Sequence, residues 1–164
     1  MQILALDTST EFLSLALSLN GRVFSRDVHA GQSHSQQILP LLRELLDEAK
    51  VNLADLDGIA FGAGPGSFTG LRIACGVAQG LAFGTQLPVV EVSTLKALAQ
   101  QSGEQKVITC LDARMNEVYY AAYEKNGDSW HEVYAPALFK PEEVPALQGN
   151  DWVGMGTGWT AYPE

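Results

Sequence analysis

The sequence has few cysteines, no long apolar run and no secretory leader. Its two cysteines, Cys75 and Cys110, lie in apolar segments without metal-like spacing, which favours reduced core thiols over a disulfide or a reactive thiol. The apolar runs are broken well short of the ~20 residues that cross a bilayer. The first residues lack the basic start and apolar segment of a signal peptide. We therefore expect a cytoplasmic protein.

Basic clusters and metal motifs are also lacking. The net charge is −9, and no two of the ten Lys and Arg residues are adjacent. Direct binding of nucleic acid needs clustered basic side chains that replace counterions, so tRNA or DNA is not expected as a direct ligand. The three histidines, His29, His34 and His131, form no H-x-x-x-H pair, and no nucleophile can be identified from spacing. We expect no metal site and no catalytic residue.

Alternating strand-like and helix-like segments predict an α/β fold. Ser33 and Gln36 match a capping box, and Pro40 is expected to kink the helix that follows or to end a loose first turn. This order favours a mostly parallel sheet that opens with an antiparallel meander. The expected segments are strands at 3–9, 12–18 and 22–29, a helix from about 34 to 50, a strand at 56–64, a helix at 67–84, a strand at 87–93 and a helix at 94–101.

The layout then repeats about a hundred residues later. Residues 106–124 again form an apolar strand ending in Leu-Asp, a polar turn, a glutamate and a second strand, so that Asp112 corresponds to Asp7. HEVYAP supplies a third strand. We predict two related lobes, residues 1–103 and 104–164, of which the second is truncated, and we interpret the chain as a fragment.

The glycine-rich stretch FGAGPGSFTGLRI spans residues 61–73. It has no Walker lysine, since the first basic residue is Arg72, and its glycines do not follow G-x-G-x-x-G. A helix N-terminus can still hold an anion. The favoured interpretation is structural: the glycines permit a sharp turn and a close approach of helix and sheet.

Asp7 and Asp112 each end a strand before a tight hairpin, as two aspartates do in the actin-like ATPase (ASKHA) superfamily, where such hairpins hold nucleotide phosphates. Those loops usually place glycine after the aspartate, but this sequence has Thr8-Ser9 and Ala113-Arg114. Arg114 either binds phosphate or is solvated or paired with Glu117. The sequence thus suggests a degraded phosphate site, with these candidates: Asp7, Thr8, Gly64, Gly66, Asp112 and Arg114.

Both long predicted helices are apolar over a wider arc than one buried face needs. The second helix holds one charge, Arg72, and small residues at four-residue intervals. A partner protein is favoured as the cover, and further chain of the protein itself is the alternative. The expected interface residues are His34, Ile38, Leu41, Leu42, Leu45, Phe68, Arg72, Cys75 and Gln79.

Five segments taken together resemble the bacterial TsaB (YeaZ) family over nearly the whole chain. They are ILALDTSTEFLSLAL, HSQQILPLL, GPGSFTGLRIACGVAQGLA, VSTL and LDARMNEVYYAAY, and the final VGMGTGW also fits.

The resemblance implies an ASKHA fold with two RNase H-like βββαβαβα lobes, the second incomplete here. It implies a non-catalytic subunit in the synthesis of threonylcarbamoyladenosine at position 37 of ANN-decoding tRNAs. Such a subunit docks through its first two helices on the catalytic TsaD, works with TsaE, forms a homodimer without TsaD and meets tRNA only indirectly. No cofactor is then expected on this chain alone, with ATP or ADP reserved for the complex. The alternatives are an ASKHA-type small-molecule kinase or carbamoyl transferase acting alone, and a glycoprotease-like peptidase.

Overall fold

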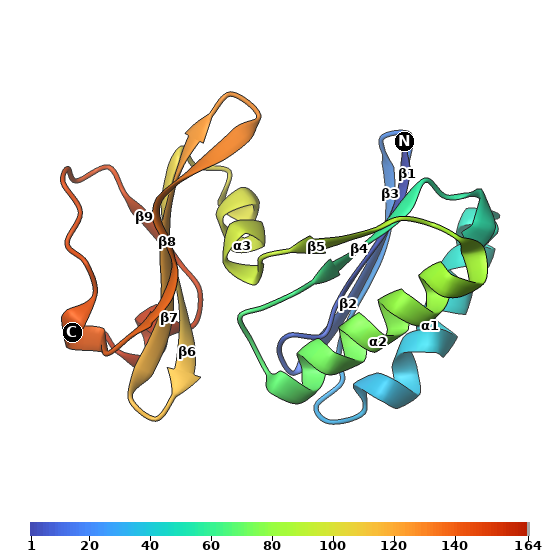
Figure 1. The fold of residues 1–164 in the computed structure, drawn as a ribbon, viewed down its shortest axis with the longest axis horizontal. Coiled ribbons are helices and arrows are strands. Elements are labelled where there is room, and N and C mark those ends of the chain that lie inside the picture. The colour runs from blue at the N-terminus through green and yellow to red at the C-terminus, as the bar shows by residue number, and fades with distance from the viewer. Residues whose placement is uncertain (164) are drawn as a thin grey trace. The chain divides into compact units, whose positions relative to one another are not determined.

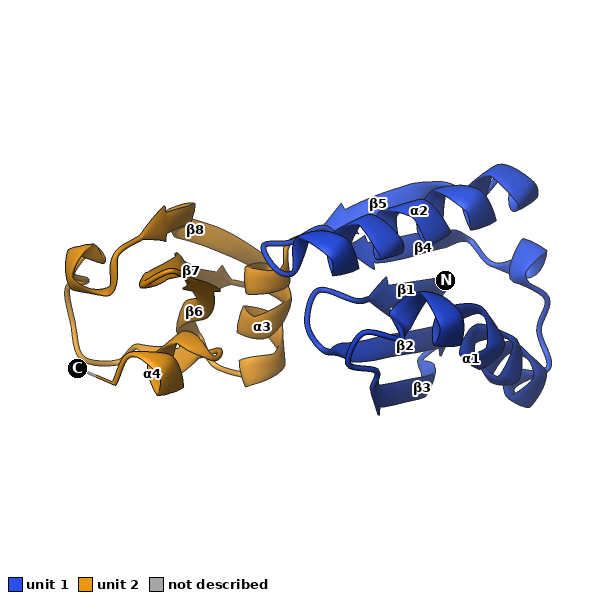
Figure 2. Ribbon diagram, turned by 90° about the horizontal axis from the view of Figure 1, so that it is seen from below, with its two compact units in different colours: residues 1–92 blue, residues 93–164 orange. Residues whose placement is uncertain are grey.

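The computed structural model describes residues 1–163. Its contacts divide the chain into two compact units, with the boundary between Val92 and Ser93 (Figure 2). Each unit has its own sheet and its own hydrophobic core. The units are therefore described one at a time.

The first unit has a five-stranded sheet with the strand order β3-β2-β1-β4-β5. The first three strands are antiparallel neighbours, whereas β4 runs parallel to both β1 and β5. This confirms the predicted parallel sheet with an antiparallel start. The elements are β1 (Gln2–Asp7), β2 (Phe12–Leu19), β3 (Arg22–His29), α1 (His34–Ala49), the short 3-10 helix η1 (Leu53–Asp55), β4 (Gly58–Gly62), α2 (Phe68–Thr85) and β5 (Val89–Val92).

Both long helices of this unit pack against one face of its sheet (Figure 1). Leucines at alternate positions of β1 and β2 point to this face, as the two-residue period of a strand requires. α1 lies over β2 and β3, and α2 lies over β4 and β1. The shared core consists of Leu4, Leu6, Leu13, Leu15, Leu17, Ala30, Ile38, Leu42, Leu45, Leu56, Ile59, Ala74 and Ala78.

The start of α1 differs from the predicted capping box. Ser33 precedes the helix, but its hydroxyl donates to the carbonyl of Ala30 at 2.6 Å and accepts from the side-chain amide of Gln37, with no bond from a backbone N–H of the first turn. The backbone of Ser33 (φ −104°, ψ 18°) is not the extended conformation that a capping serine usually adopts. Gln36 therefore completes no capping box, and the helix continues through Pro40 to Ala49.

The second unit repeats the strand order of the first. Its sheet is ordered β8-β7-β6-β9, with β6 and β9 parallel, which matches β3-β2-β1-β4. This confirms the internal repeat, and residues 93–163 supply four strands where the first unit has five. The elements are α3 (Thr94–Ser102), β6 (Lys106–Arg114), β7 (Glu117–Asn126), β8 (Ser129–Phe139), the 3-10 helix η2 (Pro141–Glu143), β9 (Val153–Met155) and α4 (Gly158–Ala161).

Helix α3 belongs to the second unit by its packing. Leu95 and Ala99 are fully buried in one cluster with Val107, Ala121 and Tyr123 of β6 and β7. By its position in the sequence, in contrast, α3 is the last element of the βββαβαβα series of the first lobe. The boundary between the compact units therefore lies eleven residues before the predicted lobe boundary after residue 103, because α3 buries its apolar side against the second sheet.

Candidate functional site: the glycine loop and the outer helix face

The glycine loop packs directly on the turn between β1 and β2. A Cβ atom at Gly70 would lie 1.8 Å from the carbonyl oxygen of Thr8, and one at Gly66 would lie 2.6 Å from that of Ser9. Both contacts involve backbone atoms, which cannot rotate away. These two glycines are therefore required by close packing within the unit, as the favoured interpretation predicted.

Hydrogen bonds also stabilise the contact between the glycine loop and the β1–β2 turn. The buried hydroxyl of Thr8 donates to the carbonyl of Gly70 at 2.6 Å, and the N–H of Ser67 donates to the carbonyl of Ser9 at 2.7 Å. At the start of α2 the hydroxyl of Ser67 accepts from the N–H of Gly70 at 3.2 Å. Two of the N–H donors at this helix terminus, those of Ser67 and Gly70, are thus bonded within the protein itself.

The carboxylate of Asp7 closes its own turn. Its Oδ1 accepts from the N–H of Ser9 at 2.8 Å and from the Ser9 hydroxyl at 2.6 Å. Gly62 leaves room for this carboxylate, because a Cβ there would lie 2.0 Å from its Oδ2. Of the six predicted phosphate-site residues, the structure thus brings Asp7, Thr8 and Gly66 together. Gly64 is buried beside Leu71 with φ +100°, a conformation that favours glycine.

Asp112 repeats this arrangement in the second unit. Its Oδ1 accepts from the N–H of Arg114 at 2.9 Å, two residues along, and from the hydroxyl of Tyr162 at 3.4 Å. Arg114 itself is exposed and begins a turn of three consecutive residues with positive φ, which continues through Met115 and Asn116. The two aspartates therefore share one local role, closing the hairpin that follows their strand.

Four of the predicted interface residues are not at a surface. Ile38, Leu42 and Leu45 are between 0% and 4% exposed and lie in the core of the first unit. His34 is also buried, and its Nε2 lies 2.8 Å from the carbonyl of Thr10 and 3.2 Å from that of Phe12. These four side chains lie on the side of α1 that faces the sheet, although Leu42 also lines the groove described below.

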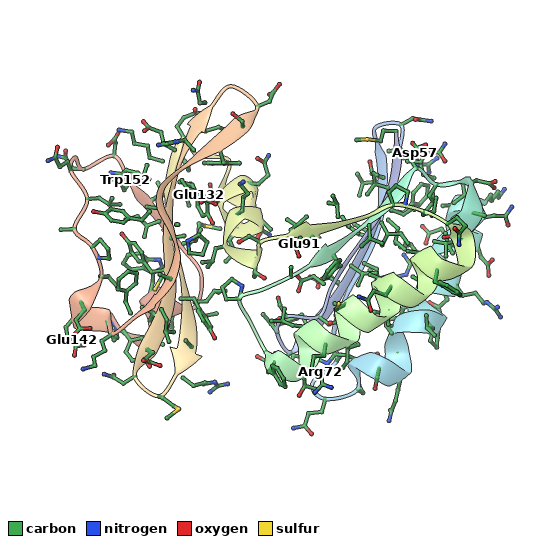
Figure 3. All side chains as sticks on the ribbon, viewed as in Figure 1. Asp57, Arg72, Glu91, Glu132, Glu142 and Trp152 are labelled. Atoms are coloured by element: carbon green, nitrogen blue, oxygen red, sulfur yellow. The ribbon has the colours of Figure 1, made fainter. Side chains whose placement is uncertain are left out.

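The outer face of α2, by contrast, is open. Phe68 is 74% and Phe83 84% exposed, and Arg72 and Gln79 are exposed between them. The Arg72 guanidinium lies 5.2 Å from the centre of the Phe68 ring, and its side chain points away from the unit (Figure 3). Cys75 is only partly exposed. These α2 residues, with Phe83 added to the predicted set, form what we call the outer face.

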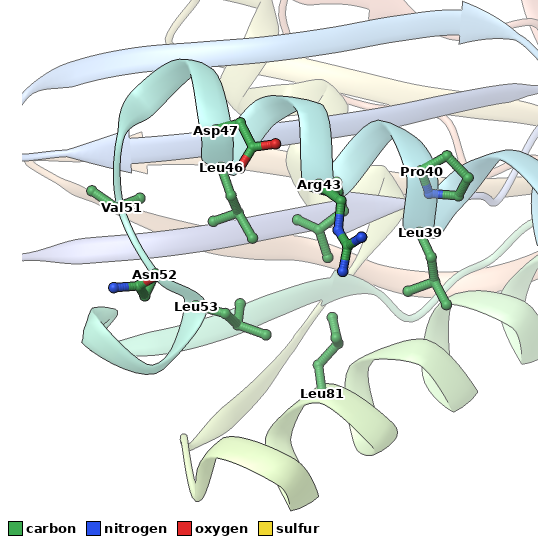
Figure 4. A pocket seen from close by; sticks show the side chains of 10 residues that line it. Leu39, Pro40, Arg43, Leu46, Asp47, Val51, Asn52, Leu53 and Leu81 are labelled. Carbon is green, nitrogen blue, oxygen red and sulfur yellow. The ribbon is translucent and has the colours of Figure 1, made fainter.

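A groove lies between α1 and α2 (Figure 4). It has a volume of about 630 Å³, and leucines from both helices and from η1 make up half of its lining residues. Arg43, Asp47 and Asn52 supply its polar side chains. The predicted interface residue Leu41 is partly buried against the core of the unit. The lining residues are Leu39, Pro40, Leu42, Arg43, Leu46, Asp47, Val51, Asn52, Leu53 and Leu81.

Sequence reasoning missed Leu39 as an interface candidate, whereas helical phase places Phe83 on the side of α2 away from the sheet. Leu39 is 53% exposed, one residue after the buried Ile38. The apolar residues of α1 cover a wide arc that includes both the side facing the sheet and part of the solvent side. The sequence pattern alone therefore does not indicate which of these residues meet the sheet. Phe83 lies four residues after Gln79, which itself lies seven after Arg72, so helical phase puts all three on one side of α2.

Metal-binding clusters and membrane-spanning helices are both absent from the part of the chain that the structure describes. Within residues 1–163, no three His, Cys, Asp or Glu side chains gather in a way that could hold a metal ion. No helix in that range has the length and apolar character needed to cross a membrane.

The protein has an ASKHA-like fold. The features that define it are the two repeated sheets, the aspartates at the strand ends and the glycine loop that is hydrogen-bonded to the β1–β2 turn. A family model described as "TsaD: tRNA N6-adenosine threonylcarbamoyltransferase" matches residues 28–154. The chain is also similar to the solved structure "YeaZ from Pseudomonas aeruginosa", with a TM-score of 0.92 and 46% identity over 99% of this chain and 78% of that one.

Curated relatives narrow this class to one family. The Escherichia coli protein named "tRNA threonylcarbamoyladenosine biosynthesis protein TsaB" is 43% identical over 100% of this chain and 74% of its own length. Its namesake from Haemophilus influenzae is 40% identical over 100% of this chain and 75% of its own length. The chain belongs to the TsaB family.

Proposed function

We propose that this protein is a non-catalytic subunit for the synthesis of threonylcarbamoyladenosine in tRNA. It acts in the cytoplasm by docking through α1 and α2 on the catalytic TsaD subunit, with TsaE as the further partner. The observation that carries the proposal is the open apolar face of α2, in a chain whose relatives bear the name of that pathway.

The composition of this face supports docking of a protein. Two phenylalanines that are 74% and 84% exposed are unusual for an otherwise acidic surface, and aromatic residues are enriched where proteins meet. The separate groove between α1 and α2 offers leucine side chains to an apolar residue of the partner. Arg43 and Asp47 stand at its edge and give the contact polar specificity.

The contacts of the glycine loop favour the proposal that this subunit binds no nucleotide when it is alone. The N–H groups of Ser9 and Ser67 and the carboxylate of Asp7 are bonded within the unit. A phosphate would have to displace the turn at Thr8 and Ser9, against which Gly66 and Gly70 pack closely. ATP or ADP is therefore assigned to the assembled complex, and tRNA, given the net charge of −9, to the partners.

The test is the affinity for purified TsaD, measured by calorimetry, for the wild-type chain and for Phe83→Asp. Loss of an anchoring ring should weaken binding at least about thirtyfold, since ~2 kcal/mol is that factor. Met115→Asp is the matched control, because Met115 is 92% exposed on a turn of the other unit. Circular dichroism verifies that both variants fold.

A reconstituted modification assay completes the test. TsaD and TsaE should modify tRNA with the wild-type chain and with Met115→Asp, and the yield should fall with Phe83→Asp. Equal affinity of all three chains for TsaD would refute the docking face. ATP hydrolysis or tight ATP binding by the chain alone would favour the kinase alternative, and cleavage of a protein substrate would favour the peptidase.

A further inference from the structure

We propose that His34 is a positioning residue that sets how the two docking helices lie relative to each other. It fixes the start of α1 on residues 8–12, called the turn segment below, and the same segment fixes the start of α2. The inference rests on the proposed function, because it states what keeps the docking surface in shape. His34 touches no partner itself, since it is buried at the first position of α1.

Three consecutive carbonyl groups of the turn segment hold the start of α1. The Nε2 atom of His34 lies 2.8 Å from the Thr10 oxygen and 3.2 Å from the Phe12 oxygen. The carbonyl between them, that of Glu11, accepts from the N–H groups of residues 30–31 at 2.9 and 3.0 Å. A carbonyl oxygen can only accept a hydrogen bond, so Nε2 of the imidazole must carry a hydrogen.

The other end of the turn segment holds the start of α2. The Thr8 hydroxyl donates to the carbonyl of Gly70, and the Ser9 carbonyl accepts from the N–H of Ser67. Thr8 and Ser9 are both buried, so water does not compete for these bonds. Five consecutive residues therefore bond to the chain at the starts of both docking helices.

The two helices depend on this segment because they touch each other little. A groove of about 630 Å³ lies between them, and each helix packs mainly on strands. Helices packed in this way can slide in small shear movements. The start of α1 also lacks a cap, since Ser33 accepts no bond from a backbone N–H of the first turn. The contact of the His34 ring with the turn segment takes the place of that cap.

A histidine suits this position because the contact needs a buried N–H donor. An aliphatic side chain at position 34 would remove the donor that faces the Thr10 and Phe12 carbonyls. A glutamine still presents a side-chain N–H to them. The other buried residues of α1 are all apolar, so none of them can supply the donor: Ile38, Leu42 and Leu45.

The affinities of His34→Leu and His34→Gln for purified TsaD test the positioning role. We expect His34→Leu to bind about tenfold more weakly, because only about one chain in ten would keep α1 and α2 in the binding arrangement. His34→Gln should restore most of the affinity. Leu17→Ala is the matched control, since Leu17 is fully buried in the same core but does not belong to the turn segment.

The control separates positioning from mere stability. Leu17→Ala should unfold at a lower urea concentration than the wild type, yet bind TsaD with wild-type affinity wherever circular dichroism shows it to be folded. An equal loss of affinity in Leu17→Ala and His34→Leu at matched folded fractions would overturn the inference.

Two measurements on the free chain need no partner. Nitrogen NMR of the His34 ring should show a hydrogen on Nε2, and a ring with hydrogen on Nδ1 alone would overturn the contact. Spin labels at Leu39→Cys on α1 and Gln79→Cys on α2 occupy exposed positions, in a Cys75→Ser background where Cys110 is buried. Diluted with unlabelled chain, they should give one narrow distance distribution, which His34→Leu broadens and His34→Gln restores.

The outcomes separate this inference from the proposed function. An unchanged distance distribution in His34→Leu would overturn the positioning role, even if TsaD binds the outer face as proposed. Failure of the proposed function would instead show as wild-type affinity of Phe83→Asp for TsaD. The label distances would then still decide whether His34 sets the arrangement of α1 and α2.

Discussion

Replacing Gly70 by alanine should destabilise the first unit through one backbone contact. The added methyl would lie 1.8 Å from the Thr8 carbonyl oxygen, so α2 and the β1–β2 turn must separate. Overpacking of this kind costs about 3 kcal/mol. Loss of the Thr8–Gly70 hydrogen bond adds roughly 1 kcal/mol, and the helix propensity of alanine returns about 1 kcal/mol. We expect a net loss of about 3 kcal/mol.

Gly80→Ala in the same helix is the matched control with the opposite sign. A Cβ at Gly80 meets nothing within 4 Å, so only the helix propensity changes. The free energy of unfolding should rise by about 1 kcal/mol. Both variants and the wild type would be unfolded in urea and followed by circular dichroism at a concentration where the chain is monomeric.

The pair of variants makes the reasoning refutable. Wild-type stability of Gly70→Ala would mean that the glycine loop does not pack on Thr8 and Ser9, and the argument against a phosphate there would fail with it. Destabilisation by Gly80→Ala of the monomer would mean that the outer side of α2 is covered by the chain itself. The expected midpoints differ by roughly 8–16 °C in thermal unfolding, because the variants lie about 4 kcal/mol apart.

Three further outcomes are expected. Thr8→Val should lower the free energy of unfolding by about 1–2 kcal/mol in urea titrations, because the Gly70 carbonyl loses its buried donor. Burial, with smaller effects of Tyr134 and Cys110, raises the pKa of Tyr120 to about 12. The folded state therefore favours the neutral phenol, so the contribution of Tyr120 to stability should hold below pH ~10 and fall by about 2–3 kcal/mol towards pH 12. In unfolding curves Tyr120→Phe should show an alkaline fall smaller by that amount, since Cys110 and Tyr123, whose pKa values burial also raises, remain. Leu42→Asp should unfold the chain by circular dichroism, whereas Phe83→Asp should keep the wild-type spectrum, because only the former buries a carboxylate.

Much of the fold was predictable because its signals are local. The meander, the two long helices and the repeated Leu-Asp strand ends follow from periodicity and turn residues, and the structure has each of them. That Ser33 forms no capping box was not predictable from the sequence. Its hydroxyl donates to the carbonyl of Ala30, and this contact depends on how the chain leaves β3. The packing of α3 likewise depends on the second sheet and not on its own sequence.

The site was predicted less well, for a physical reason. Composition showed that α1 has more apolar surface than one sheet needs, but buried Ile38 and exposed Leu39 are equally apolar. Only tertiary contacts decide which of them meets solvent. On α2 the single charge at Arg72 marks the solvent side, and there the predicted Phe68 and Gln79 are indeed exposed.

The glycines of α2 that pack against nothing inside the unit have a consequence for the degradation of the protein. Gly76, Gly80 and Gly84 together weaken the helix by roughly 2–3 kcal/mol relative to alanine, and nothing inside the unit needs them. A partner that covers this face would offset the loss by mass action. Free copies would open more often than bound ones and would be degraded first. Proteolysis would thereby adjust the amount of this subunit to the amount of its partner, without any dedicated regulator.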